Sequence, residues 1–188
     1  MDLFDKALAF AVKAHAGAAR KGTDVPYILH PLEVAVIAGT LTNDPEILAA
    51  AVLHDTVEDT PATLAGIESA FGGRVARLVA SETEDKRPGV PPEESWQIRK
   101  EESLRELKNA PDPGTKIIWL SDKLSNMRSF YRMYRREGAK LWERFHQSDP
   151  AKQAWYYRTV AEYTGELSGT DAWREYADLT EKVFEGVK

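Results

Sequence analysis

Apolar residues recur along most of the chain at the three- and four-residue spacing of an α-helix. No segment keeps the apolar-polar alternation that is typical of a β-strand. In the first predicted helix, Phe4, Leu8 and Ala11 share one face, and Gly17 is expected to end it. The pattern therefore predicts an all-α protein.

Proline, glycine and polar capping residues set the expected limits of the other helices. These helices are expected at 31–41, at 44–59, on both sides of a Gly72-Gly73 break, from a cap at Glu94 or Ser95 up to PDPG, and at 113–136, 138–146, 150–168 and 171–185. Asp44 is the predicted N-cap of the second of these, with Pro45 at its first helical position. That helix is apolar nearly all round, so it is expected at the centre of the fold.

Length and composition narrow the class of protein. A chain of 188 residues is expected to form a single domain over 1–188. A net charge of −5 argues against a protein that coats nucleic acid or an anionic membrane. There is no cysteine, so any metal must be bound by His, Asp or Glu. The acidic, amphipathic N-terminus is unlike a targeting peptide, and a cytoplasmic location is expected.

The stretch AAAVLHDTVEDT places four ionisable residues directly after a run that is expected to be buried. In a continuous helix His54 would lie over Glu58 and Asp55 over Asp59, because residues four apart share a face. Burying unpaired carboxylates costs several kcal/mol or forces protonation, and a divalent cation would remove that cost. The alternative interpretation is a polar helix end that faces solvent.

Two distant residues complete a possible metal site. His30 stands immediately before Pro31 at a predicted helix start, a position that is often purely structural. Asp122 begins a polar stripe beside an apolar one, although it could equally be a solvated residue paired with Lys123 or Arg128. Together His30, His54, Asp55 and Asp122 supply two imidazoles and two carboxylates. That set suits Mn²⁺, Fe²⁺, Co²⁺ or Zn²⁺ with water in the open positions.

Four sequence blocks occur in the order and at the separations of a known family. They are RKGTDVPYILHP, AAVLHDTVEDT, FGGRVARLV and LSDKLSNMRS. The chain resembles the HD superfamily of metal-dependent phosphohydrolases, and in particular the hydrolase domains of RelA/SpoT-type enzymes and the small alarmone hydrolases. The resemblance covers residues 1–130, and 131–188 are expected to form additional C-terminal helices.

The resemblance implies an HD-domain helical bundle with one divalent metal, most often Mn²⁺, and a nucleotide substrate. Its implied metal ligands are His30, His54, Asp55 and Asp122. Glu58 and Asp59 would orient and deprotonate the attacking water. The implied substrate contacts are Arg20 stacked on the purine, Lys21 on phosphate and Asn126 beside the nucleoside. Arg128, which begins a basic stripe next to the site in sequence, is a further candidate for binding substrate phosphate.

The implied reaction removes the 3′-pyrophosphate from ppGpp or pppGpp. Two other hypotheses stay open, namely an HD phosphohydrolase of another nucleotide, such as ppApp or a nucleoside monophosphate, and a non-catalytic nucleotide-binding regulator. In each case the expected partner is a small nucleotide, with no nucleic acid polymer or membrane involved. The sequence leaves the oligomeric state open.

Three features depart from the family or lie beyond it. IWLSD places Trp119 where the family commonly has a lysine, so a phosphate contact is lost, an aromatic wall replaces it, or Trp119 faces the core. The loop from Arg20 to Tyr27 is one residue longer than usual. A basic stripe, interrupted by Gly138, is either a solvated face or a phosphate-binding surface near its start. The stripe comprises Arg128, Arg132, Arg136, Lys140 and Arg144.

Overall fold

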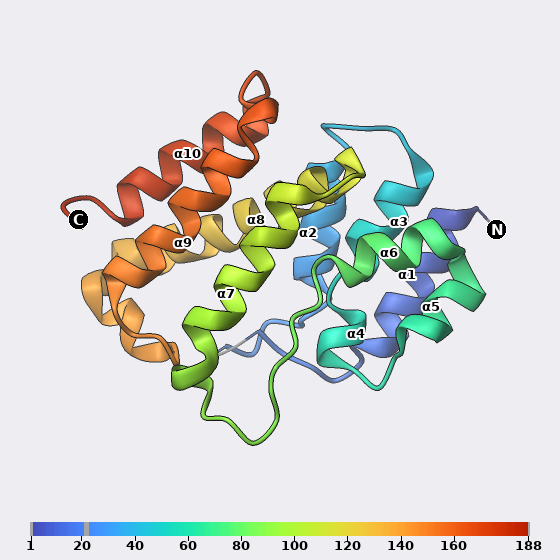
Figure 1. Cartoon of the computed structure of the whole chain (residues 1–188), viewed down its shortest axis with the longest axis horizontal. Coiled ribbons are helices and arrows are strands. Elements are labelled where there is room, and N and C mark those ends of the chain that lie inside the picture. The colour runs from blue at the N-terminus through green and yellow to red at the C-terminus, as the bar shows by residue number, and fades with distance from the viewer. Residues whose placement is uncertain (1, 21–22, 188) are drawn as a thin grey trace.

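The computed structural model describes residues 2–20 and 23–187, and these residues form an all-α fold (Figure 1). Among them the one β-type pairing is an isolated bridge between Ala19 and Pro26. No described helix is both long and apolar enough to cross a membrane. The structure therefore confirms the all-α prediction.

Within the described residues, six helices precede the proline-rich loop, and four α-helices with two 3₁₀ helices follow it. The first six are α1 (Leu3–Ala14), α2 (Leu29–Ala38), α3 (Pro45–Leu53), α4 (Thr56–Asp59), α5 (Leu64–Phe71) and α6 (Gly73–Ala80). The others are α7 (Pro92–Asn109), α8 (Pro113–Glu137), η1 (Gly138–Arg144), α9 (Pro150–Tyr163), η2 (Gly165–Leu167) and α10 (Asp171–Val183).

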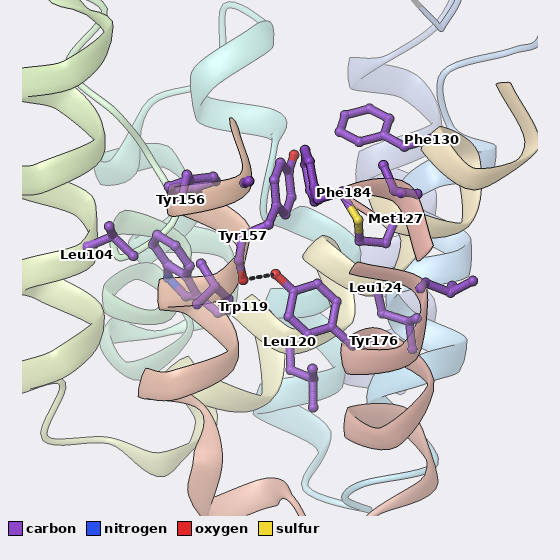
Figure 2. Packing of buried hydrophobic residues seen from close by; sticks show 14 of the residues in the cluster. Leu104, Trp119, Leu120, Leu124, Met127, Phe130, Tyr156, Tyr157, Tyr176 and Phe184 are labelled. Carbon is purple, nitrogen blue, oxygen red and sulfur yellow. Dashed lines mark hydrogen bonds between the residues drawn. The ribbon is translucent and has the colours of Figure 1, made fainter. Parts of the chain in front are cut away.

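Helix α8, which is 25 residues long, joins two hydrophobic cores. On one side its Ile118 packs into the core formed by α1, α2, α3, α5 and α6. On the other side its Leu120 and Leu124 join the aromatic-rich core of α7, α9 and α10 (Figure 2). In that second core the hydroxyl of Tyr176 donates to the carbonyl of Tyr157 at 2.8 Å. Helix α3 is buried near the centre of the first core, as its composition predicted.

The beginnings of α3 and α8 are fastened together. Asp44 caps α3 as predicted, because its side chain accepts from the backbone N–H of Glu46. Asp112 caps α8 in the same way. The guanidinium of Arg74 on α6 bridges the caps, at 2.7 Å from Asp44 and 2.8 Å from Asp112. This fixes the relative position of α8, which carries Asp122, and α3, which is followed directly by His54.

The predicted continuous helix over 44–59 is wrong. Helix α3 ends at Leu53, a turn contains His54 and Asp55, and α4 begins at Thr56. The His54 ring lies 2.8 Å from the carbonyl of Ala51, and the Thr56 hydroxyl donates to that of Leu53 at 2.6 Å. The His54 and Thr56 side chains therefore hydrogen-bond to backbone carbonyls that would pair with backbone N–H groups in a continuous helix.

Other boundaries also differ from the predictions. Helix α7 begins at Pro92, after a cap at Pro91 that lies three to four residues before the predicted cap, because proline suits the first helical turn and two glutamates follow it there. The segment predicted as a helix over 138–146 is a 3₁₀ helix, and α9 ends at Tyr163. Gly138, at φ 59°, separates η1 from α8, so the basic stripe is interrupted where the sequence predicted.

Candidate active site

Three buried side chains from three separate elements converge on one point. His30 comes from the first turn of α2, His54 follows α3, and Asp122 lies in the middle of α8. One potential ligand atom from each lies within 4.8 Å of the others. Nε2 of His30 is 3.0 Å from Oδ1 of Asp122, and Nε2 of His54 is 3.8 Å from it. Such separations fit ligands that share one ion at ~2.0–2.2 Å each.

Asp55 lies on the fourth side of this cluster. Its Oδ2 is 3.0 Å from Nε2 of His54 and 3.5 Å from Nε2 of His30. The structure therefore brings together all four residues that the family resemblance implied as metal ligands.

The rings of both histidines are held by hydrogen bonds at Nδ1. Nδ1 of His54 lies 2.8 Å from the carbonyl of Ala51, and because a carbonyl only accepts, this nitrogen carries the proton. Nδ1 of His30 lies 2.9 Å from the hydroxyl of Ser125, which donates to Glu33 at 2.8 Å. These contacts direct both Nε2 atoms toward the carboxylates, in the orientation that metal-binding histidines adopt.

Arg128 extends this supporting chain. Its guanidinium donates to Glu33 at 3.1 Å and to both carboxylate oxygens of Glu175 at 2.6 and 2.7 Å. Arg128 is absent from the lining of the two cavities described below. Its predicted contact with substrate stays a prediction. The geometry favours a role in positioning Glu33, which accepts a hydrogen bond from Ser125, the partner of His30.

The carboxylates of the site favour positive charge beside them. Burial lowers the pKa of His54, but Asp55 and Asp122 outweigh burial and raise that pKa to about 10. Burial raises the pKa of Asp55, yet the neighbouring histidines bring it well below its ordinary value. The carboxylates are therefore held ionised in a buried setting, where a divalent cation neutralises them most directly.

The predicted acid pair stands beside this cluster on α4. The hydroxyl of Tyr27 lies 2.6 Å from Oδ2 of Asp55 and 3.0 Å from Oδ2 of Asp59. The ammonium of Lys86 is 2.7 Å from Asp59 and 3.5 Å from Glu58. Burial, followed by the charge of Asp55, raises the pKa of Glu58. A carboxylate with a raised pKa is better suited to accept a proton near neutral pH.

Two predicted substrate contacts adjoin the cluster as well. Nη2 of Arg20 donates to Asn126 at 3.0 Å, and the amide of Asn126 donates to Asp122 at 2.8 Å. The guanidinium of Arg20 also lies over the Tyr27 ring, 5.6 Å from its centroid. The predicted phosphate contact of Lys21 falls outside the described residues.

Two neighbouring cavities share Arg20, Tyr27 and Asn126. The smaller, about 220 Å³, contains His30, Asp55 and Asp122 in its lining. The rest of that lining is charged and consists of Glu58, Asp59, Glu82, Glu84, Arg99, Lys100 and Lys123. The larger, about 1120 Å³, is lined mainly by aromatic residues and arginines, among them Phe130, Tyr131, Phe145, Tyr157, Arg132, Arg135, Arg136 and Arg144. Together they are large enough for a nucleotide.

Sequence reasoning missed several residues of the site. Tyr27 lies inside one of the matched blocks, PYILHP, but no spacing rule links it to Asp55, which is 28 positions away. Lys86 reaches the acid pair from the loop after α6. Lys123 follows Asp122 directly, and the sequence suggests it only as an ion-pair partner of a solvated Asp122. In the structure it lines the smaller cavity.

A family model described as the HD domain matches residues 7–148, and the chain belongs to this family. The match extends past residue 130, where the matched sequence blocks end. The fold prediction of a single HD-domain helical bundle is confirmed. A solved structure described as a metazoan ortholog of SpoT that hydrolyses ppGpp shares the fold, with a TM-score of 0.77 and 24% identity over 100% of this chain and 98% of that one.

Two relatives carry names that indicate an activity. The chain is 38% identical over 135 residues to a guanosine-3′,5′-bis(diphosphate) 3′-pyrophosphohydrolase of Aquifex aeolicus (strain VF5), covering 72% of this chain and only 18% of that relative's length. It is 41% identical over 128 residues to the human guanosine-3′,5′-bis(diphosphate) 3′-pyrophosphohydrolase MESH1, covering 65% of this chain and 66% of that protein.

Proposed function

We propose that this protein is a metal-dependent 3′-pyrophosphohydrolase of ppGpp, pppGpp or a related alarmone. The observation that carries the proposal is that three of the four proposed ligands and the acid pair line the smaller cavity, which shares Arg20, Tyr27 and Asn126 with a larger cavity rich in arginine. The names of the Aquifex and human relatives support it. The proposed substrate is a free nucleotide of the cytoplasm, with no nucleic acid polymer or membrane as partner.

The donor set fits one divalent metal ion, which we propose is Mn²⁺. His30, His54, Asp55 and Asp122 would hold it. The buried Nε2 of His54 makes no hydrogen bond of good geometry among the described residues, although Oδ2 of Asp55 lies 3.0 Å away, so it is available to a metal. Two imidazoles with two carboxylates suit a borderline cation that keeps water ligands. When bound, such an ion lowers the pKa of its water and stabilises charge on a phosphate oxygen.

Glu58 and Asp59 are the proposed groups that orient the attacking water and take its proton. They lie outside the group of three ligand atoms but border the same cavity. Lys86 and Tyr27 restrain Asp59 from two sides. The raised pKa of Glu58 suits its carboxylate to accept a proton near neutral pH.

The larger cavity favours a substrate with a second phosphorylated end. Among the described residues, Arg132 hydrogen-bonds only to Ser129, and Arg135 lies over the ring of Tyr131. Neither they nor Arg136 has a carboxylate partner in the described part of the chain. Guanidinium groups without acidic partners are suited to phosphate. A nucleoside monophosphate hydrolysed at the metal cluster would leave these arginines without a ligand.

The aromatic walls of this cavity offer stacking surfaces for either purine ring. Because stacking accepts either purine, the test includes both guanine and adenine nucleotides. It is a hydrolysis screen with the Mn²⁺-supplemented protein over ppGpp, pppGpp, ppApp and GMP, with products separated and identified. The proposal expects GDP from ppGpp, GTP from pppGpp, and pyrophosphate from both. Release of orthophosphate, or turnover of GMP alone, would refute it.

A further inference from the structure

Trp119 occupies the position where the resembling enzymes commonly have a lysine, and here it faces the protein core. Its side chain is only 2% exposed and packs among the residues of the second core (Figure 2). The indole N–H donates to the carbonyl of Ser81 at 3.1 Å. Trp119 lines neither cavity, so it provides no wall for a nucleotide.

One helical turn further along α8, Lys123 places a cation beside the metal cluster. Residues four apart share a helix face, and the ammonium of Lys123 lies 4.6 Å from the centroid of the Trp119 ring. It pairs with Oδ2 of Asp122, while Oδ1 of the same carboxylate faces His30. The ammonium therefore adjoins the ligand cluster on the side of the smaller cavity.

A buried glutamate stands on the other side of this lysine. Oε2 of Glu82 is 3.6 Å from the ammonium of Lys123, and the Glu82 side chain is 2% exposed. Its Oε1 has no hydrogen-bond partner among the described residues, and Glu82 lines the smaller cavity. Trp119 and Glu82 therefore restrict where the ammonium of Lys123 can move.

Two further cations line the same cavity from α7. Arg99 donates to Glu84 at 2.6 Å, and Lys100 pairs with the other oxygen of that carboxylate. Lys100 also lies over the ring of Tyr156, 4.7 Å from its centroid. Arg99, Lys100 and Lys123 therefore all contribute cations to the lining of the smaller cavity, next to the carboxylates that pair with them. Of the three, Lys123 is the one that pairs with a residue of the ligand cluster.

We propose that Lys123 binds the phosphate that lies against the metal cluster, in place of the lysine that is missing at position 119. In this arrangement Trp119 and Glu82 are positioning residues that hold the ammonium at the cavity wall. The inference rests on the proposed function, because it requires a phosphorylated substrate. It also explains how this chain binds phosphate there although Trp119 departs from the family pattern.

The test compares Lys123→Met with Lys116→Met, a control on the same helix whose lysine pairs with Glu166 and lines neither cavity. Binding of inorganic pyrophosphate to the Mn²⁺-loaded protein is measured by calorimetry, together with bound metal. Loss of a charge-assisted contact is expected to weaken pyrophosphate binding by roughly 10- to 100-fold in Lys123→Met. Bound metal is expected to be unchanged, and Lys116→Met is expected to match the wild type.

Pyrophosphate affinity that is unchanged in Lys123→Met would overturn the proposal. So would a parallel loss of metal and pyrophosphate, because Lys123 would then serve only to support Asp122. If Lys123→Met fails to fold, Lys123→Gln removes the charge while keeping a donor for Asp122, and the same outcomes apply. A wild type that binds pyrophosphate through Lys123 but does not hydrolyse ppGpp would refute the proposed function and leave this inference standing.

Discussion

The hydroxyl of Tyr27 lies 2.6 Å from Oδ2 of Asp55 and so joins the loop before α2 to the metal-ligand cluster. The Tyr27 hydroxyl is also 3.0 Å from Oδ2 of Asp59, one of the two proposed water-activating acids. Burial and the nearby carboxylates raise the pKa of Tyr27 well above its ordinary value, so the phenol remains a donor. One side chain therefore sets the relative position of a ligand and a base.

Replacing this hydroxyl is expected to reduce turnover more than metal binding. A hydrogen bond to a charged group contributes ~1.5–3 kcal/mol, so Tyr27→Phe should lower kcat about 10-fold or more while bound metal stays near the wild-type level. The control is Tyr163→Phe, whose ring lies outside both cavities. A Tyr27→Phe variant with wild-type kcat would show that Asp59 needs no such restraint.

The acid pair is expected to act on the water rather than hold the metal. Glu58→Gln and Asp59→Asn should each keep the metal and lose most turnover, because a positioned general base contributes ~10²–10⁴-fold. Steady-state kinetics and metal analysis of the same preparations check this, with the exposed Glu68→Gln as control. If metal and activity disappear together, these residues are metal ligands instead.

The arginines that line the larger cavity are expected to recognise the 5′-phosphates of the substrate. Arg132→Met and Arg136→Met should each raise KM for ppGpp about 10-fold, since a charge-assisted contact is lost. Neither should change KM for guanosine 3′-diphosphate, which has no 5′-phosphate. Arg174→Met serves as control, because Arg174 pairs with Asp171 on α10 and lines neither cavity. Equal increases for both substrates would argue against this assignment.

The Arg74 clamp predicts a pH-dependent contribution to stability. Hydrogen bonds from Arg74 lower the pKa values of Asp44 and Asp112 in the folded state. Their contribution is therefore fully present above the ordinary aspartate pKa of ~4 and is lost as pH falls through the lower folded values.

Arg74→Met should lower the free energy of unfolding at pH 7 by about 1–2 kcal/mol, given three partly exposed pairs at ~0.2–1 kcal/mol each. The loss should shrink markedly at pH 3, as measured by denaturant unfolding at both pH values. Arg105→Met, an exposed position on α7, is the control. A loss of the same size at both pH values would show that the clamp acts through packing.

Local signals predicted most of the helical fold. The caps at Asp44 and Asp112 and the positive φ of Gly72 depend on residues near in sequence, and helix limits there agree to within a residue or two. The break after Leu53 was not predictable from apolar spacing. It depends on the His54 and Thr56 side chains bonding to backbone carbonyls, and periodicity contains no record of such bonds.

Residue types and the order of the motifs were enough to predict which residues form the ligand cluster, but not which lysines lie beside it. Family resemblance brought His30, His54 and Asp122 together before any geometry was known, and the structure places them in one cluster. The roles of Lys86 and Lys123 depend on contacts between segments far apart in sequence, which a single sequence does not specify. For Trp119 the sequence left open a pocket wall or a core position, and the structure places it in the core.

The most direct test of the account is the metal content of the purified protein. Mass spectrometry should find one divalent metal ion per chain in the wild type. His54→Ala should contain far less, because removing one imidazole leaves only three of the four proposed ligands. His146→Ala, which changes a histidine far along the chain from the cluster and outside both cavities, is the control and should match the wild type. Equal metal content in the wild type and His54→Ala would contradict the account.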